Sequence, residues 1–329
     1  MHIEQSLPTI DQLPNSYAIY AENLSAISVT GEEADKYLQG QLTCDVNLLA
    51  EKHLLVGGHC DAKGKLFSAF RLINHFQQRL LIQNKQALNE SLAQLNKFGV
   101  FAKVDISEAT ELGFLALVGD QAKTFISNTF HSVPDSFTPV VSDEDVSIVY
   151  ICGATNRYLI IAKQDKIKAL ASASKLAVFG QQVWSLLEIA SGFADMNATS
   201  VNEYVPQMLN LQLVNGISFT KGCYLGQETV ARMKYLGRNK KALYALKTEG
   251  EAKWQTDAEI NEHSSLEKQL GENWRNAGNI ITHYQADDGT IYLQAVLAND
   301  TEEDAVLRLK HQNGIKFSLM SLPYSLQES

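Results

Sequence analysis

One eight-residue segment, Lys221 to Glu228, combines a cysteine with residue types that could make its thiol reactive. Its sequence is Lys-Gly-Cys-Tyr-Leu-Gly-Gln-Glu, so Cys223 follows a lysine closely and has a glycine on either side. Glycine lets the backbone adopt positive φ or approach another group closely. Cysteine is nucleophilic as the thiolate, and neighbouring cations lower the pKa of a thiol. The segment therefore indicates either a tight turn around a buried cysteine or a loop that presents a reactive thiol.

The residues after this loop are rich in positive charge. From Lys221 to Lys241, six basic residues stand against one acidic residue, Glu228, a net charge of +5, whereas the whole chain carries −9. We call residues 221–241 the basic segment. The acidic total argues against binding of nucleic acid over the whole surface, whereas the basic segment suits a local anion-binding site.

Hydrophobic periodicity predicts a mixed α+β scaffold for residues 1–241. A capping-box spacing, Thr30 followed by Glu33, predicts that a helix begins near Gly31. The stretch 132–145 is expected to be an exposed loop. A strand–helix–strand–strand–helix order occurs twice, which predicts two ferredoxin-like subdomains. We expect strands at 17–29, 66–73, 112–118, 146–151 and 157–162, and helices at 31–38, 88–98, 121–129, 166–176 and 183–190.

The residue pattern changes after Lys241. Apolar residues alternate from Ile291 to Leu297, directly after the turn residues 287–289, Asp-Asp-Gly. Asn313-Gly314 is a second hairpin signal. Residues 242–329 are therefore predicted to form a small antiparallel β-barrel or sandwich.

Composition and cysteine spacing narrow the class of protein. The chain has 45% hydrophobic and 20% charged residues, as in ordinary globular proteins. Its four cysteines are far apart and form no CxxC pair, which argues against a zinc site or a disulfide framework. Adjacent residues of a strand point to opposite faces, so the run His59-Cys60-Asp61 does not converge on one ion, and no metal site is predicted. No signal peptide or membrane span is visible, so a cytoplasmic location is expected.

The segment Lys221–Glu228 resembles the K-G-C-Y-x-G-Q-E signature of the YgfZ family, folate-binding, tRNA-modifying proteins related to the glycine-cleavage aminomethyltransferase. Further agreement extends along nearly the whole chain, at residues 37–41, 59–65, 205–207, 210–212, 230–232, 271–275 and 322–326. The resemblance implies an aminomethyltransferase-like fold, with two ferredoxin-like subdomains and a C-terminal antiparallel β-barrel around a central channel. It also implies that the protein binds tetrahydrofolate or a derivative. Its partners would be iron–sulfur enzymes, including one that thiomethylates tRNA.

The resemblance also implies positions for the folate site. Trp184 matches a tryptophan next to the folate, whereas Leu24 stands where family members can carry a second one. Loss of one aromatic platform is expected to weaken folate binding by roughly tenfold. Cys223 is the implied functional thiol, at the mouth of the folate pocket. The implied cofactor-binding residues are Leu24, Trp184, Lys221, Gly222, Tyr224, Gln227, Glu228 and Arg232.

Two alternative functions remain open from the sequence. An aminomethyl or one-carbon transferase needs a carboxylate to assist transfer to the folate nitrogen, but Phe67 and Ser68 stand where the related transferases carry an Asp pair. A direct tRNA-binding protein could use the basic segment, although Tyr235 is the only aromatic residue interleaved with its basic residues. With one cysteine in the motif, no permanently bound cluster is predicted.

Overall fold

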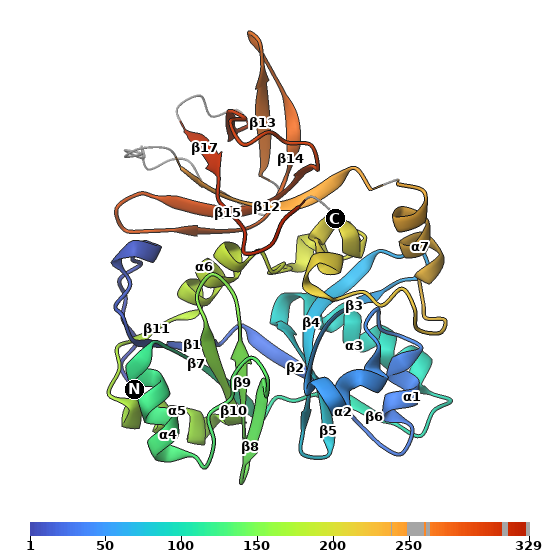
Figure 1. Ribbon diagram of the computed structural model, residues 1–329, viewed down its shortest axis with the longest axis vertical. Coiled ribbons are helices and arrows are strands. Elements are labelled where there is room, and N and C mark those ends of the chain that lie inside the picture. The colour runs from blue at the N-terminus through green and yellow to red at the C-terminus, as the bar shows by residue number, and fades with distance from the viewer. Residues whose placement is uncertain (238, 249–259, 261–263, 311–314, 327–329) are drawn as a thin grey trace.

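Two β-sheets lie side by side beneath a closed β-barrel in the computed structural model of the chain (Figure 1). The structure describes residues 1–237, 239–248, 260, 264–310 and 315–326. The predicted α+β class with a C-terminal antiparallel barrel is confirmed. Within these described ranges, no helix has the length and apolar character that crossing a membrane requires.

The first sheet is antiparallel and has five strands. Its core joins apolar residues of its strands, such as Ile27 and Phe70, to Leu88 and Leu95 of the long helix that covers it. The strand order is β3 (Leu54–Cys60), β4 (Leu66–His75), β5 (Gln78–Asn84), β2 (Leu24–Thr30) and β6 (Asp105–Glu108). The helical segments of this part are α1 (Ala34–Gln39), η2 (Val46–Leu48), α2 (Leu49–Lys52) and α3 (Lys85–Gly99).

The helix expected from Gly31 begins three residues later, so this prediction of its start was wrong. Gly31 has φ of +109°, and a Cβ there would lie 2.3 Å from the carbonyl oxygen of Lys103. The Glu33 carboxylate accepts a hydrogen bond from the Lys103 backbone N–H at 3.0 Å instead of capping the helix. Contacts with a distant turn thus override the local capping pattern.

The second sheet has six strands and is covered on one face by two helices. Ala122 and Ile126 of α4 and Ile167 and Leu170 of α5 pack on this face. The strand order is β11 (Val178–Phe179), β1 (Tyr17–Tyr20), β7 (Leu112–Val118), β10 (Arg157–Lys163), β9 (Val146–Ile151) and β8 (Val140–Asp143), with helices α4 (Asp120–Thr129) and α5 (Gln164–Ser174). β8 lies inside the stretch 132–145 that was expected to be a loop, so that expectation was wrong there.

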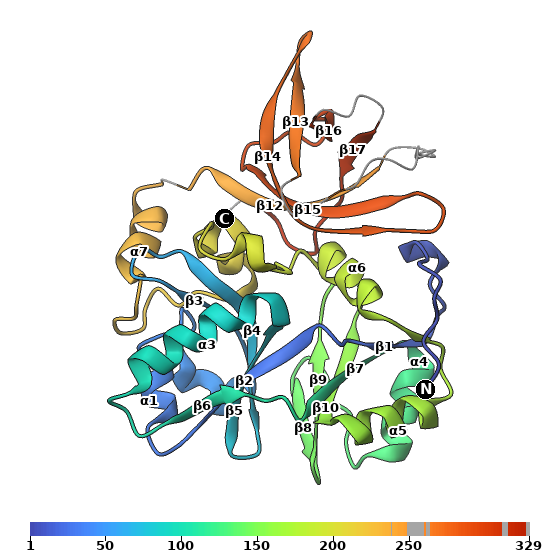
Figure 2. The same ribbon diagram turned by 180° about the vertical axis from the view of Figure 1, so that it is seen from behind.

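The opposite face of the second sheet belongs to a core shared by all three parts. Helix α6 (Gln181–Ser191) places Val183, Trp184 and Leu187 in this core, together with Ile82 of β5 and Tyr292 of the barrel. Figure 2 shows α6 between the second sheet and the barrel. A residue of α6 is therefore positioned by both the sheet and the barrel.

The barrel closes because its first and last strands pair. The predicted hairpin at 287–289 is confirmed, and Asn313-Gly314 lies outside the described residues. The order is β12 (Lys241–Thr248), β15 (Ile291–Ala298), β14 (Asn273–Gln285), β13 (Ser265–Leu270), β16 (Leu307–Leu309) and β17 (Lys316–Leu319). The remaining helical segments are η1 (Ile10–Gln12), η3 (Ala198–Ser200), η4 (Pro206–Leu209), η5 (Leu211–Val214) and α7 (Gln227–Tyr235).

Candidate functional site

The backbone of the cysteine loop is held against the segment that follows α1. Ser218 donates its N–H to the Thr43 carbonyl at 2.9 Å, and Leu225 donates to the Gly40 carbonyl at 3.1 Å. The buried Thr43 hydroxyl donates to the Gly216 carbonyl at 2.6 Å. These bonds anchor the loop on both sides of Cys223, so its conformation is set by tertiary contacts.

The second glycine of the loop packs against a turn between β3 and β4. Gly226 has φ of +83°, and a Cβ there would lie 2.5 Å from the Asp61 carbonyl oxygen and 2.9 Å from Gly64 Cα. Gly64 also has positive φ, at +76°. The glycine-bearing segments 59–65 and 221–228, separate in the sequence, thus meet with backbone against backbone, where a side chain does not fit.

Lys221 is buried, and its ammonium binds backbone carbonyls. Nζ donates to the Leu42 carbonyl at 2.8 Å and to the Cys44 carbonyl at 2.7 Å. It also lies 5.2 Å from the ring centroid of Tyr224, which is buried too. Burial lowers the pKa of Lys221 to about 8, against the opposing effect of Cys44 and Asp45. Lys221 therefore fastens the cysteine loop to the segment that follows α1, and we call the loop clamped in this sense.

Cys223 and Gly222 are exposed at the tip of this clamped loop. A Cβ on Gly222 would meet nothing within 4 Å, so the tip is open on this side too. By contrast, Cys44 and Cys60 are buried, and burial raises the pKa of both thiols, that of Cys44 to about 12. The structure thus separates an accessible loop thiol from two inert core thiols, while Cys152 is exposed elsewhere.

Three other predicted site residues lie on α7, Gln227 and Glu228 in its first turn and Arg232 in its last. Gln227 Oε1 accepts a hydrogen bond from the Tyr224 N–H at 3.3 Å. Glu228 and Arg232 form an ion pair at 2.7 Å, with both side chains mostly exposed. Such a pair contributes at most about 1 kcal/mol because water screens it.

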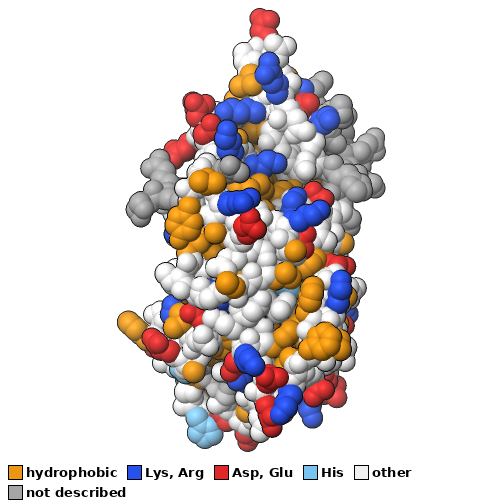
Figure 3. Space-filling model, turned by 90° about the vertical axis from the view of Figure 1, so that its right-hand side faces the viewer, with side chains coloured by type: hydrophobic (Ala, Val, Ile, Leu, Met, Phe, Trp, Pro, Cys, Tyr) orange, Lys and Arg blue, Asp and Glu red, His pale blue; other side chains and the backbone are white. Residues whose placement is uncertain are grey.

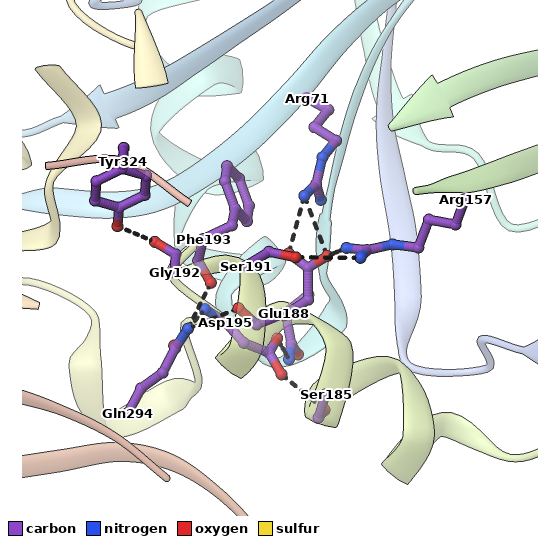
Figure 4. A network of polar contacts seen from close by, with 11 residues as sticks. Arg71, Arg157, Ser185, Glu188, Ser191, Gly192, Phe193, Asp195, Gln294 and Tyr324 are labelled. Carbon is purple, nitrogen blue, oxygen red and sulfur yellow. Dashed lines mark hydrogen bonds and ion pairs between the residues drawn. The ribbon is translucent and has the colours of Figure 1, made fainter. Parts of the chain in front are cut away.

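Trp184 packs in the shared core against the guanidinium of Arg157. Arg157 belongs to a buried charge network with Arg71 and Glu188 (Figure 4). The Trp184 side chain is 1% exposed, and the Arg157 guanidinium carbon lies 4.5 Å from its ring centroid. Arg71 and Arg157 both donate to the Glu188 carboxylate, with Arg71 at 3.0–3.1 Å. Burial lowers the pKa of both arginines, and the charge of Arg71 lowers that of Arg157 further. The ring therefore packs against guanidinium groups and does not form an open platform.

A polar cavity of about 240 Å³ borders α6, the end of β5 and strand β14. Asn23, the neighbour of Leu24, and Ser185, the neighbour of Trp184, both line it. Within it, Asp195 accepts hydrogen bonds from Asn84 at 2.7 Å and from Ser185 at 2.8 Å. Burial raises the pKa of Asp195, while these two bonds oppose the rise. The chain segments that carry positions 24 and 184 thus meet at one cavity.

The predicted site residues fall into two groups on different elements. Leu24 and Trp184 belong to the core around α6, whereas Ile217 and Val230, which flank the cysteine loop, belong to another core. In both ribbon views, α6 lies near the middle of the molecule and α7 at its edge (Figures 1 and 2).

The three charged residues of the network are not predicted from the sequence as site residues. A signal exists for each of them. Arg71 interrupts the apolar run 66–73, Arg157 begins an apolar strand, and Glu188 lies in an apolar stretch of α6. A lone charge in such a context is seldom fully buried unless it is paired, so the three could have been expected to meet.

The position expected to carry the transferase acid has no carboxylate. Phe67 and Ser68 are buried in β4, where Phe67 packs edge-on against His59 with ring centroids 5.0 Å apart. Burial lowers the pKa of His59 to about 3. Among the residues that the structure describes, no three His, Cys, Asp or Glu side chains are grouped to hold a metal ion.

The fold is that of the aminomethyltransferase class. A crystal structure of the glycine cleavage system aminomethyltransferase T from Bartonella henselae aligns over 95% of this chain and 87% of its own, with a TM-score of 0.67 and 15% identity. Residues 239–312 match the model of the YgfZ β-barrel domain. The tRNA-modifying protein YgfZ of Colwellia psychrerythraea is 53% identical over 322 residues, 98% of this chain and 97% of that protein. Its namesake in Yersinia enterocolitica is 36% identical, with the same coverage. The chain belongs to the YgfZ family.

Proposed function

We propose that this chain is a folate-binding accessory protein that supports the maturation or repair of iron–sulfur enzymes, and thereby tRNA modification. The relatives' name, tRNA-modifying protein, supports the second part. The observation that carries the proposal is the exposure of Cys223 on a loop whose neighbours Lys221 and Tyr224 are buried. The anchored loop thus holds the thiol out in solvent, where a partner can reach it.

Cys223 is the group that would do chemistry in this role. Exposure gives it access to a partner, and the clamped loop holds the thiol in place while the partner docks. It would bind an iron–sulfur intermediate, take a sulfane sulfur from a donor persulfide whose thiolate leaves, take a one-carbon group from a carrier whose amine leaves, or form a mixed disulfide by exchange with a disulfide of the partner. The tRNA link is through an iron–sulfur enzyme that modifies tRNA.

In this proposal, the cavity at Asp195 would take the ring end of a folate. A pterin needs acceptors for its N–H groups, and these would be the Asp195 carboxylate, the Asn84 amide oxygen and the Ser185 hydroxyl, which all line the cavity. A tetrahydrofolate carries one-carbon units when it is bound. Pockets for whole drug-sized ligands measure about 300–1,000 Å³, so 240 Å³ suits the rings alone. Leu24 and Trp184 do not line this cavity themselves, but their neighbours Asn23 and Ser185 do.

The test of the thiol is complementation of cells that lack the protein. Cys223→Ala should fail to restore thiomethylated nucleosides in bulk tRNA, as measured by liquid chromatography with mass spectrometry. Cys152→Ala is the matched control, since it removes the other exposed thiol, and it should restore them. Full restoration by a folded Cys223→Ala protein would overturn the role of the thiol.

The test of folate binding is calorimetric titration with tetrahydrofolate. We expect Asp195→Ala to weaken binding by tenfold or more. Arg232→Ala tests the predicted contribution of the basic segment to the anionic tail. Absence of binding up to millimolar tetrahydrofolate would remove folate from the proposal while leaving the thiol test standing.

A further inference from the structure

A second cavity, of about 210 Å³, lies on the flank of the molecule between η4, η5, α7 and β12. Phe219, Leu213 and Met233 contribute apolar surface to it, and Lys234 lies at the same cavity. None of its residues borders the cavity at Asp195. It is therefore a separate site.

Two glutamine side chains in the wall of this cavity have amide oxygens that accept no hydrogen bond from the described part of the chain. Gln207 is 3% exposed, and its Nε2 donates to the Val230 carbonyl at 2.6 Å. That bond fixes the orientation of the amide, because a flipped amide would place two acceptors together. Its Oε1 and the Oε1 of Gln212 are both buried and have no partner in the described part of the chain. A buried acceptor without a partner costs about 1–3 kcal/mol, so a ligand with N–H donors would be favoured once either amide oxygen turns toward the cavity.

The fold brings aromatic and cationic groups together at this cavity. Lys234 Nζ lies 4.0 Å from the ring centroid of Phe219, and the ring of Tyr235 lies 6.5 Å from that of Phe219. Phe219 lies just before the basic segment, so it was not counted when aromatic residues were sought among the basic ones. Arg232, Lys240 and Lys241 are exposed nearby along the chain. Figure 3 shows Lys and Arg side chains beside hydrophobic ones on this side of the molecule.

The size of the cavity limits its ligand to one planar ring system. Its 210 Å³ is below the about 300 Å³ at which pockets hold a whole drug-sized ligand. A nucleotide has both parts that this site suits, because its base is a planar ring with N–H donors and its phosphates are anions that the cations can bind. Stacking of a base on an aromatic side chain contributes about 1–3 kcal/mol to RNA binding.

We propose that this cavity binds one unpaired base of an RNA, with an exocyclic amine on the base, while Lys240 and Lys241 contact the flanking phosphates. The choice of RNA as ligand rests on the proposed function in tRNA modification. Adenine and cytosine offer amine donors to Gln207 and Gln212, whereas uracil has carbonyl oxygens at its exocyclic positions. The protein would thus contact RNA directly, in addition to its link through a partner enzyme.

The test is a titration with labelled RNA pentamers that differ only in the central base. We expect the pentamer with adenine to bind about tenfold tighter than the one with uracil. Gln212→Leu should abolish that preference, and Phe219→Leu should weaken both pentamers by about tenfold. Lys240→Ala/Lys241→Ala should reduce the salt dependence by one to two phosphate contacts.

The controls are matched in residue type. Phe137→Leu removes an exposed ring elsewhere, and Lys123→Ala/Lys168→Ala removes two exposed lysines of the second sheet's helices. Equal affinity for the two pentamers, or no effect of Phe219→Leu, would overturn the proposal, as would adenosine monophosphate binding as tightly as the pentamer. Tetrahydrofolate titration of Phe219→Leu should match the unmodified protein, so failure at one cavity is distinguishable from failure at the other.

Discussion

The ammonium of Lys221 donates to the backbone carbonyl of Cys44 at 2.7 Å, although 177 residues separate the two in the sequence. The sequence pattern suggests this lysine as a cation that activates Cys223. The structure directs it away, to carbonyls of the segment that follows α1. Its contribution is to hold the loop, which keeps the thiol at a defined place on the surface.

Lys221→Met should destabilise the protein. Two buried carbonyls lose their donor, which we expect to lower the free energy of unfolding by about 2 kcal/mol at pH 7. Urea denaturation measures the change. Lys63→Met, at an exposed position of the neighbouring turn, should change stability by no more than about 0.5 kcal/mol. Equal effects of the two substitutions would show that the ammonium does not hold the loop.

The free energies of unfolding of the unmodified protein and of Lys221→Met should diverge as pH rises. The pKa of Lys221 is about 8 in the folded chain and 10.5 as the unperturbed value. Between these values the unfolded chain keeps a proton that the folded chain has lost, so this group adds stability with increasing pH. The stability gap between the unmodified protein and Lys221→Met should widen by about 1 kcal/mol from pH 7.5 to pH 9. Parallel pH profiles would contradict the lowered pKa.

The two glycines of the cysteine loop should respond differently to alanine. Gly226→Ala places a Cβ 2.5 Å from the Asp61 carbonyl at positive φ, and we expect a loss of about 1–3 kcal/mol. Gly222→Ala meets nothing within 4 Å and should be close to neutral. Thermal unfolding of both variants gives the comparison. A neutral Gly226→Ala would mean that the turn at Asp61 moves away freely.

Only part of this architecture could be predicted from the sequence. Helix α3, with its apolar residues at helical spacing, and the hairpin at 287–289 depend on local pattern and turn chemistry, and both are confirmed. The start of α1 could not be predicted because Lys103, far along the chain, takes the Glu33 carboxylate.

In the candidate site too, features that depend on the local sequence could be predicted, whereas features that depend on distant contacts could not. That Cys223 is exposed agrees with the proposed role of its glycine-flanked motif. The carbonyl partners of the Lys221 ammonium could not be predicted, nor could the position of a guanidinium over the Trp184 ring, since each depends on a partner from another subdomain or strand. Charge counting also placed Lys221 in the basic segment as a cation for an anion-binding site, whereas the structure buries its side chain.

Thiol accessibility should separate the four cysteines into two pairs. Cys44 and Cys60 are at most 2% exposed, and burial raises the pKa of their thiols. Brief treatment of the native protein with iodoacetamide should therefore label Cys152 and Cys223 alone, as read by peptide mass spectrometry. In urea all four should be labelled. Rapid native labelling of Cys44 would show that the loop opens on the timescale of the reaction.

Glu188 should be the most sensitive residue of the shared core. Its carboxylate is the acceptor for both Arg71 and Arg157, and all three side chains are buried. Glu188→Gln leaves two buried cations facing each other with one neutral partner, so we expect a loss of about 3–5 kcal/mol in the free energy of unfolding. The control is Asp35→Asn, which removes the acceptor of the more exposed pair with Arg79 and should cost about 1 kcal/mol or less. Urea denaturation of both variants decides the matter, because similar small losses would mean that Asp195 or solvent neutralises the arginines in place of Glu188.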